Sequence, residues 1–221
     1  MKFKDKALSS MQNFARAMFM PVLILPIVGL LVAVANLFTN ASLIQQFPFL
    51  DNPVTIGFGT ILSGCMQPIL SNLGLIFCVG VSVGLAKEKK QDAAFISVVT
   101  FVVFLNAMNK FMNLQGLLAP ADALSGTGQS ITLGVQVLEM GAFLGILLGI
   151  VVSQVHNRFI NTEFKGAFQI YGGQRFVFIV MIPVTIILAV VCTYVWPPIQ
   201  SVISAFGHVI GNSGNLGYFL F

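Results

Sequence analysis

The sequence predicts an all-α fold: a polytopic membrane helical bundle of about five transmembrane helices, preceded by an amphipathic interfacial helix. Of the 221 residues, 57% are hydrophobic and only 8% are charged, whereas an ordinary soluble domain carries about 25% charged residues. The mean hydropathy is +0.92. The basic residues lie in short gaps between long apolar runs, which is the membrane pattern. These observations exclude an ordinary soluble enzyme, a nucleic-acid-binding domain and a disordered chain.

The first element is an amphipathic helix over residues 1–18. Its apolar side chains recur at helical spacing, and lysines and an arginine supply the charge on the other positions. A basic helix of this kind lies in the headgroup region of an anionic leaflet. The alternative is a charged extension of the first span. The apolar positions are Phe3, Ala7, Leu8, Met11, Phe14, Ala15 and Met18.

The first span is predicted over residues 19–38, with Pro21 and Pro26 in its first two turns. Pro21 is tolerated there, whereas Pro26 is expected to kink the helix. The next apolar region, residues 54–86, is too long for one straight span and short for two. Glycines, Pro68 and Asn72 gather in its first two thirds. We therefore expect a broken or re-entrant first part, then a span that ends near Ala86.

Three further spans complete the predicted bundle. A polar loop separates the third from the fourth and a second loop separates the fourth from the fifth, while Trp196-Pro197-Pro198 closes the fifth span at the interface. The ranges are 93–108 for the third span, 110–130 for the first loop, 131–155 for the fourth span, 156–175 for the second loop, 176–196 for the fifth span and 199–221 for a weakly amphipathic tail.

The distribution of basic residues predicts the orientation. With a cytoplasmic N-terminus and a single crossing by residues 54–86, every one of the 11 basic residues except Lys110 lies on the inner side. The opposite orientation would leave only Lys110 inside. Because short cytoplasmic loops carry an excess of Lys and Arg, we predict a cytoplasmic N-terminus and five crossings.

One acidic residue and two sets of glycines are the candidate functional features within the spans. Glu139 lies inside the predicted fourth span, where an ionisable group marks either a functional site or a structural hydrogen-bond acceptor. Glycines at a spacing of four let another helix approach closely. They predict helix packing or dimer contacts, with a pore lining as the alternative. These glycines are Gly80, Gly84, Gly141, Gly145 and Gly149.

The sequence predicts no catalytic residue, metal site or cofactor. Cys65, Cys78 and Cys192 each lie in an apolar run without a CxxC or zinc spacing. There is no Ser/His/Asp arrangement, no P-loop and no dinucleotide-binding glycine pattern. His156 stands beside Asn157 and Arg158, which predicts a solvated position at a span end.

Several stretches together resemble one membrane protein family. Phe14–Leu23 resembles its opening amphipathic helix and first span, and Gly80–Lys87 resembles a later span end with its basic loop. Gly126-Thr127-Gly128 precedes Leu138-Glu139-Met140, and His156–Phe159 follows the fourth span. In this order, the stretches resemble the IIC permease component of the phosphoenolpyruvate-dependent sugar phosphotransferase system. The glucose/glucoside superfamily is the nearest group, and within it the maltose, α-glucoside and arbutin-like branch.

The resemblance covers the N-terminal half of such a permease. It implies that residues 19–196 form the five-span scaffold and dimerisation half, that 197–221 start the sugar-binding half, and that the chain is truncated. The implied activity is translocation of a glucose- or glucoside-type sugar across the bacterial plasma membrane, coupled to its phosphorylation by IIB and IIA partners. The complete permease is expected to be a homodimer in contact with lipid. The phosphorylated IIB cysteine is absent, so an enzymatic role of this chain stays open.

Within this resemblance, Glu139 and Arg175 are the polar residues expected along the substrate pathway. Two other functions stay open. One is half of a proton-coupled secondary transporter that uses Glu139. The other is a non-transporting membrane interaction protein that uses its glycine stripes.

Overall fold

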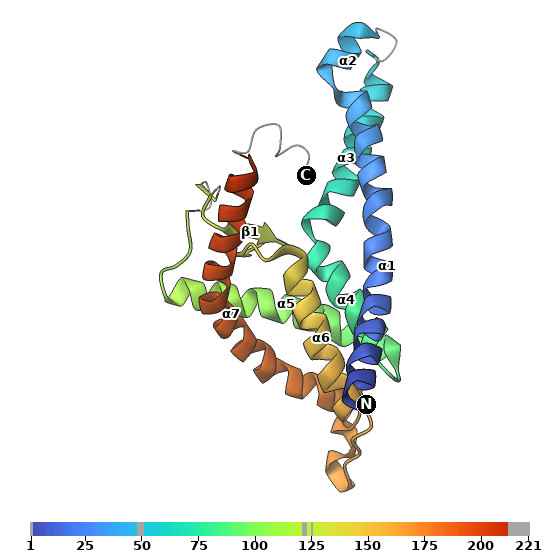
Figure 1. Ribbon diagram of the computed structural model, residues 1–221, viewed down its shortest axis with the longest axis vertical. Helices are drawn as coiled ribbons and strands as arrows, with labels where there is room; N and C mark the ends of the chain where they lie inside the picture. The colour runs from blue at the N-terminus through green and yellow to red at the C-terminus, as the bar shows by residue number, and fades with distance from the viewer. Residues whose placement is uncertain (1, 48–50, 121–122, 125, 212–221) are drawn as a thin grey trace. The chain divides into compact units, whose positions relative to one another are not determined.

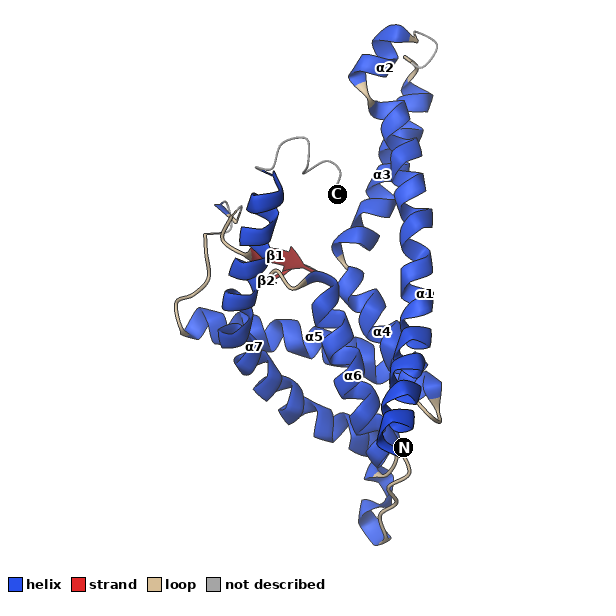
Figure 2. Cartoon of the chain, in the orientation of Figure 1, coloured by secondary structure: helices blue, strands red, loops and turns tan. Residues whose placement is uncertain are grey.

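The computed structural model describes residues 2–47, 51–120, 123–124 and 126–211. Figure 2 shows that these residues are mostly helical, with a single small hairpin of two strands. Five of the described helices are long and apolar enough to cross a membrane. The predicted all-α membrane bundle is therefore confirmed. The five candidate spans are Met11–Thr39, Pro53–Ser71, Lys90–Leu114, Gly141–Phe159 and Gln174–Ala205.

The chain forms two compact units, and each is described by itself. The first unit contains residues 1–101 and 141–180, and the second contains residues 102–140 and 181–221. Two long helices, α5 (Lys90–Leu114) and α7 (Gln174–Gly211), begin in the first unit and end in the second.

Helix α1 (Lys2–Thr39) runs through residue 18 without a break and continues through Pro21 and Pro26 (Figure 1). No interruption separates the predicted interfacial segment from the first span. The position of residues 1–18 at a membrane surface stays a prediction. After α1, the short helix α2 (Ala41–Gln46) is capped by Asn40, whose Oδ1 accepts the Ser42 N–H at 2.9 Å.

The region predicted to be broken consists of α3 (Pro53–Ser71) and α4 (Leu73–Leu85), and the break lies at Asn72. The backbone N–H and the Nδ2 of Asn72 both donate to the Pro68 carbonyl, at 3.1 and 2.7 Å. Helix α3 packs against the end of α1, where the rings of Phe38 and Phe58 meet edge to face with centroids 5.9 Å apart. This contact packs α3 against α1 within the first unit.

Glycines set the packing of α4 against α1. Gly84 lies against Ala17, and Gly80, four residues earlier in α4, lies against Pro21, four residues later in α1. The absence of a Cβ permits this approach. The order of the contacts shows that α4 runs antiparallel to α1.

A second glycine pair joins α4 to α6 (Gly141–Phe159). Gly145 lies against the Gly74 backbone, and a Cβ built on Gly149 would lie 2.8 Å from the Val81 Cβ. These contacts advance together along both helices, so α4 and α6 are parallel. An antiparallel α1 and a parallel α6 agree with the prediction that residues 54–86 cross the membrane once.

The predicted fourth span, residues 131–155, is wrong at its start. Residues 129–138 form an antiparallel hairpin of β1 (Gln129–Thr132) and β2 (Val135–Leu138), and α6 begins only at Gly141. Leu133 and Gly134 have φ values of 49° and 78°, and two positive φ values are typical of a two-residue hairpin turn that matches the twist of its strands. The β-branched residues on either side of the turn favour strands.

The predicted end of the fifth span at Trp196 is also wrong, because α7 continues through Pro197 and Pro198. The fixed φ of proline is compatible with a helix, but its ring removes an N–H donor. The carbonyls of Thr193 and Tyr194 therefore lose their usual partner four residues on. Of the predicted segment 197–221, residues 212–221 lie outside the described residues.

Helix α5 extends past the predicted span 93–108 at both ends. A short 3-10 helix, η3 (Gly166–Tyr171), lies in the connection between α6 and α7. The buried apolar side chains form one core in each unit. In the first unit they include Phe77, Cys78, Val81, Ile96, Leu144, Leu148 and Val152, and in the second Phe104, Leu105, Met108, Met112, Val137, Met181 and Trp196.

Candidate functional site

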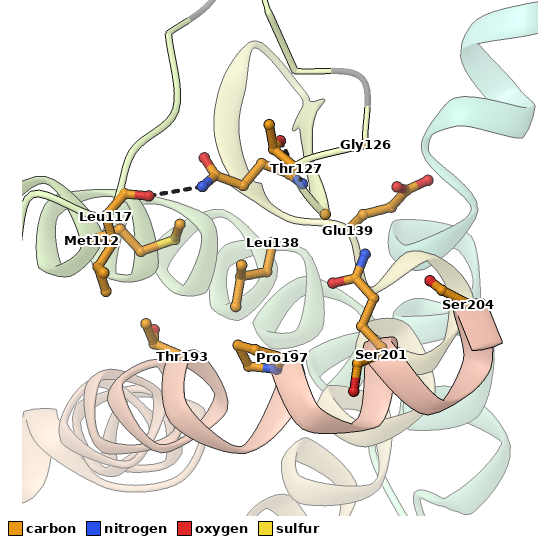
Figure 3. A pocket seen from close by; sticks show the side chains of 13 residues that line it. Met112, Leu117, Gly126, Thr127, Leu138, Glu139, Thr193, Pro197, Ser201 and Ser204 are labelled. Atoms are coloured by element: carbon orange, nitrogen blue, oxygen red, sulfur yellow. Dashed lines mark hydrogen bonds between the residues drawn. The ribbon is translucent and has the colours of Figure 1, made fainter.

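The second unit holds a cavity of about 490 Å³ between the hairpin, the end of α5 and α7 (Figure 3). Its volume lies within the range of ligand pockets. In Figure 3, Met112 and Leu117 lie at one end of the cavity, and Glu139 and Ser204 lie at the other. Leu138 and Pro197 form an apolar strip between these ends.

Two glutamine side chains fix the wall that the hairpin contributes. Gln129 Nε2 donates to the Leu117 carbonyl at 2.8 Å, and its Oε1 accepts the Ala119 N–H at 3.1 Å. Gln136 Nε2 donates both to Gln129 Oε1 at 2.8 Å and to the Ala119 carbonyl at 2.9 Å. These amides hold the loop after α5 to the hairpin and leave that wall little freedom.

Two hydrogen bonds fix the backbone of Glu139, one at its N–H and one at its carbonyl. Its N–H donates to the Gly128 carbonyl at 2.9 Å, and its own carbonyl accepts the indole N–H of Trp196 at 3.0 Å. Trp196 is buried. The backbone of Glu139 is therefore fixed, and its exposed side chain is part of the cavity lining.

The wall that α7 contributes is a mostly polar face of this helix, interrupted by Pro197. Its residues lie about one or two turns apart, which places them on one side of the helix. The hydroxyls of Thr193 and Ser201 bond to carbonyls of their own helix, at 2.9 and 2.8 Å. The residues of this face are Thr193, Pro197, Gln200, Ser201 and Ser204.

Gly128 permits the close approach of the hairpin to α7. Its φ is +73°, and a Cβ there would lie 2.8 Å from Gln200 Oε1. Gly126 also has a positive φ, +78°, but meets nothing within 4 Å. The motif Gly126-Thr127-Gly128 thus brings backbone against the Gln200 side chain, and a Cβ at position 128 would have to displace that side chain.

The cavity lining offers hydrogen-bonding groups and a single charge. Among the described residues that line it, one carries a carboxylate, two carry amides and four carry hydroxyls, and none is Lys, Arg, His or Cys. The side chains of Glu139, Gln200 and Ser204 have no hydrogen bond to another described residue. These three groups are available to a ligand.

The position of Glu139 differs from the sequence prediction. It is exposed and lies between β2 and α6 rather than inside a span. The apolar run from Ile131 reads as helix by hydropathy alone, but the hairpin uses its first part. Apart from polar residues at helical spacing after Pro197, nothing in the sequence indicated Gln200 and Ser204.

The other predicted site residues belong to the first unit. Arg175 is exposed in the first turn of α7, where its Nη1 donates to the Ile170 carbonyl at 2.6 Å and supports η3. Gly80, Gly84, Gly145 and Gly149 all meet helices of their own chain, as described above. A Cβ on Gly141 (φ +52°) would meet nothing within 4 Å. Their role in a dimer stays a prediction.

The first unit also joins two basic loops at one end. Asn157, near the end of α6, accepts the Lys87 N–H at 2.8 Å and donates to the Leu85 carbonyl at 3.0 Å. His156 is fully buried rather than solvated, with Nε2 2.9 Å from the Glu88 carbonyl. The loop after α4 and the end of α6 therefore share one face of this unit.

Comparison with known proteins identifies one family, and its relatives are components of the same transport system. The family model described as "Phosphotransferase system, EIIC" matches residues 15–221. The maltose-specific EIICB component of Escherichia coli strain K12 is 31% identical over 212 residues, which are 95% of this chain and 40% of that protein.

Two glucose-specific EIICBA components are similar as well. That of Staphylococcus carnosus strain TM300 is 33% identical over 218 residues, or 98% of this chain and 32% of the relative. That of Staphylococcus saprophyticus is 31% identical over 218 residues, or 98% of this chain and 31% of the relative. The chain thus spans about a third to two fifths of the length of these relatives. With the family match over nearly its whole length, the chain belongs to the EIIC family of the sugar phosphotransferase system.

Proposed function

We propose that this chain is the first part of a permease that carries a glucose- or α-glucoside-type sugar across the bacterial plasma membrane. In the complete system a IIB partner, itself supplied by IIA, phosphorylates the sugar. The family match over residues 15–221 carries this proposal. The names of the relatives, one maltose-specific and two glucose-specific, support the sugar class.

The first unit supports a cytoplasmic N-terminus. The bonds of Asn157 bring the basic loop that follows α4 to the basic end of α6. Ala17 lies against Gly84 near the end of α4, which brings Arg16 toward the same end. Because basic residues collect on the cytoplasmic side, we place this end in the cytoplasm. In the topology predicted from the sequence, Lys110 is the basic residue on the outer side, and the loop and hairpin that follow it are placed there as well.

The proton-coupled alternative depends on an acid inside a span. Glu139 lies outside α6 and is exposed, so the observation that favoured this alternative is gone. The resemblance also predicts a homodimer of the complete permease. At four of the five predicted positions the glycine meets a helix of the same chain, which supports a role of these glycines in helix packing.

The test is a chimera in which this chain replaces the matching stretch of the maltose-specific relative. The host lacks its own glucose and maltose permeases, and uptake of radiolabelled maltose and glucose is measured. We expect uptake that yields phosphorylated sugar and that stops when the phosphotransfer proteins are deleted. The relative itself is the positive control, and the relative without that stretch is the negative control.

Two outcomes would contradict the proposal. A chimera that reaches the membrane in normal amount but moves no sugar would favour a non-transporting interaction protein. Accumulation of unmodified sugar that a proton uncoupler abolishes would favour a proton-coupled transporter.

A further inference from the structure

We propose that the cavity of the second unit binds a neutral sugar on the outer side of the membrane, with the Glu139 carboxylate as its principal hydrogen-bond acceptor. This inference rests on the proposed function and adds a binding site within the first part of the permease. It is carried by the cavity, its unpartnered polar groups and their charge.

The charge of the lining selects the ligand class. Glu139 is the only charged side chain among the described residues around the cavity, and no cation offsets it there. A phosphorylated sugar or another anion would meet uncompensated repulsion. A neutral ligand that carries several hydroxyls instead supplies donors to the carboxylate, and hydrogen bonds to a charged group are the stronger ones.

The lining combines polar groups with an apolar strip, which are the two kinds of group that a sugar ring can contact. Glu139 and Ser204 lie at one end of the cavity (Figure 3). Gln200 adds an amide that can both donate and accept. Leu138 and Pro197 supply an apolar strip for the C–H face of a ring. A ligand that combines hydroxyls with an apolar face uses all of these groups.

The site is also preorganised. The backbone of Glu139 is fixed on both sides, by Gly128 and by Trp196, and the amides of Gln129 and Gln136 hold the hairpin wall. A ligand therefore does not have to order this wall on binding, which favours affinity.

Trp196 provides the measurement, because it is the only tryptophan of the chain and its indole bonds to the Glu139 carbonyl. The purified chain in detergent is titrated with maltose, with glucose and with glucose 6-phosphate while its tryptophan emission is recorded. Equilibrium dialysis with radiolabelled maltose measures binding independently. We expect saturable binding of maltose or glucose, and at least about 10-fold weaker binding of glucose 6-phosphate.

Two substitutions make the test specific to the carboxylate. Glu139→Ala is expected to weaken sugar binding about 10-fold or more, because it removes the charged acceptor. Glu139→Gln, which keeps the shape, is expected to fall between this variant and the native chain. Glu163→Gln is the matched control: Glu163 is also an exposed glutamate, but it lies in the first unit and lines another cavity. This control is expected to bind as the native chain does.

The outcomes separate the inference from the proposed function. An absence of saturable sugar binding by the folded chain, or unchanged binding by Glu139→Ala, overturns the inference. Equal affinity for glucose 6-phosphate overturns it as well. Uptake by the chimera reports separately on the function, so a transporting chimera whose KM is unaffected by Glu139→Ala leaves the function intact and rejects this site.

Discussion

The contact between α4 and α6 and the wall of the cavity are both close-packed, but they are held by different forces. Gly145 and Gly149 bring backbone against backbone in an apolar surrounding, where small residues permit dispersion contacts. The hairpin wall is held by amide hydrogen bonds of Gln129 and Gln136. The first arrangement tolerates no added volume, whereas the second depends on its hydrogen-bond donors and acceptors.

The largest effect is expected from Gly145→Leu. The new side chain would overlap the Gly74 backbone, which cannot move away as a flexible side chain does. We expect a loss of more than about 3 kcal/mol in the free energy of unfolding. Thermal unfolding and size-exclusion profiles in detergent measure it. Gly64→Leu is the control, because a Cβ on Gly64 would meet nothing within 4 Å; similar losses in both variants would contradict the backbone contact.

Gly128→Ala sharpens the comparison at the cavity, where strain and a clash occur together. A positive φ costs an L-residue about 1–2 kcal/mol, and the added Cβ would also displace the Gln200 side chain. Gly126→Ala carries the same kind of strain without the clash. Both variants are expected to lose similar stability, but only Gly128→Ala is expected to weaken sugar binding. Equal binding by the two would show that Gln200 is not displaced or not used.

Gln136→Ala tests the amide network. It removes the donor that serves both Ala119 and Gln129, and we expect a loss of about 1–2 kcal/mol. Limited proteolysis of the loop after α5 is expected to be faster in this variant. The matched variant is Gln115→Ala, since the Gln115 side chain is exposed. If both variants are cleaved at the native rate, the network does not hold the loop.

The smallest effect is expected at the basic end of the first unit. Asn157→Ala removes bonds to Leu85 and Lys87 that close the end of α4, at a loss of about 1 kcal/mol. Asn161→Ala removes only an exposed bond to the Glu88 carboxylate and is expected to cost less. Urea or thermal unfolding in detergent measures the loss in free energy of unfolding of each variant. A larger loss in Asn161→Ala than in Asn157→Ala would contradict the prediction.

Hydropathy and glycine spacing predicted the helical bundle and an interruption within residues 54–86, and four of the five glycines that they singled out lie where helices approach one another. These features depend on local composition and on side-chain size, which a sequence displays. The hairpin at residues 129–138 was missed because its apolar residues satisfy a hydropathy criterion as well as a span does. The turn at Leu133-Gly134, between β-branched residues, was the available signal.

The candidate site was predicted only in part. Glu139 was singled out, but for a position inside a span that it does not occupy. Gln200 and Ser204 could not be predicted, because α7 was expected to end at Trp196. Prolines 197 and 198 suggested a helix end, whereas the helix continues and merely loses two internal donors.

The register between α1 and α4 has a mechanical consequence. Ala17 lies against Gly84, one residue before α4 ends, so the part of α1 before Ala17 extends past α4. At about 1.5 Å per residue this arm is about 22 Å long, more than twice the distance of about 8 Å over which surface charge is felt at physiological salt. The first residues of α1 are therefore held beyond the end of α4 rather than beside it.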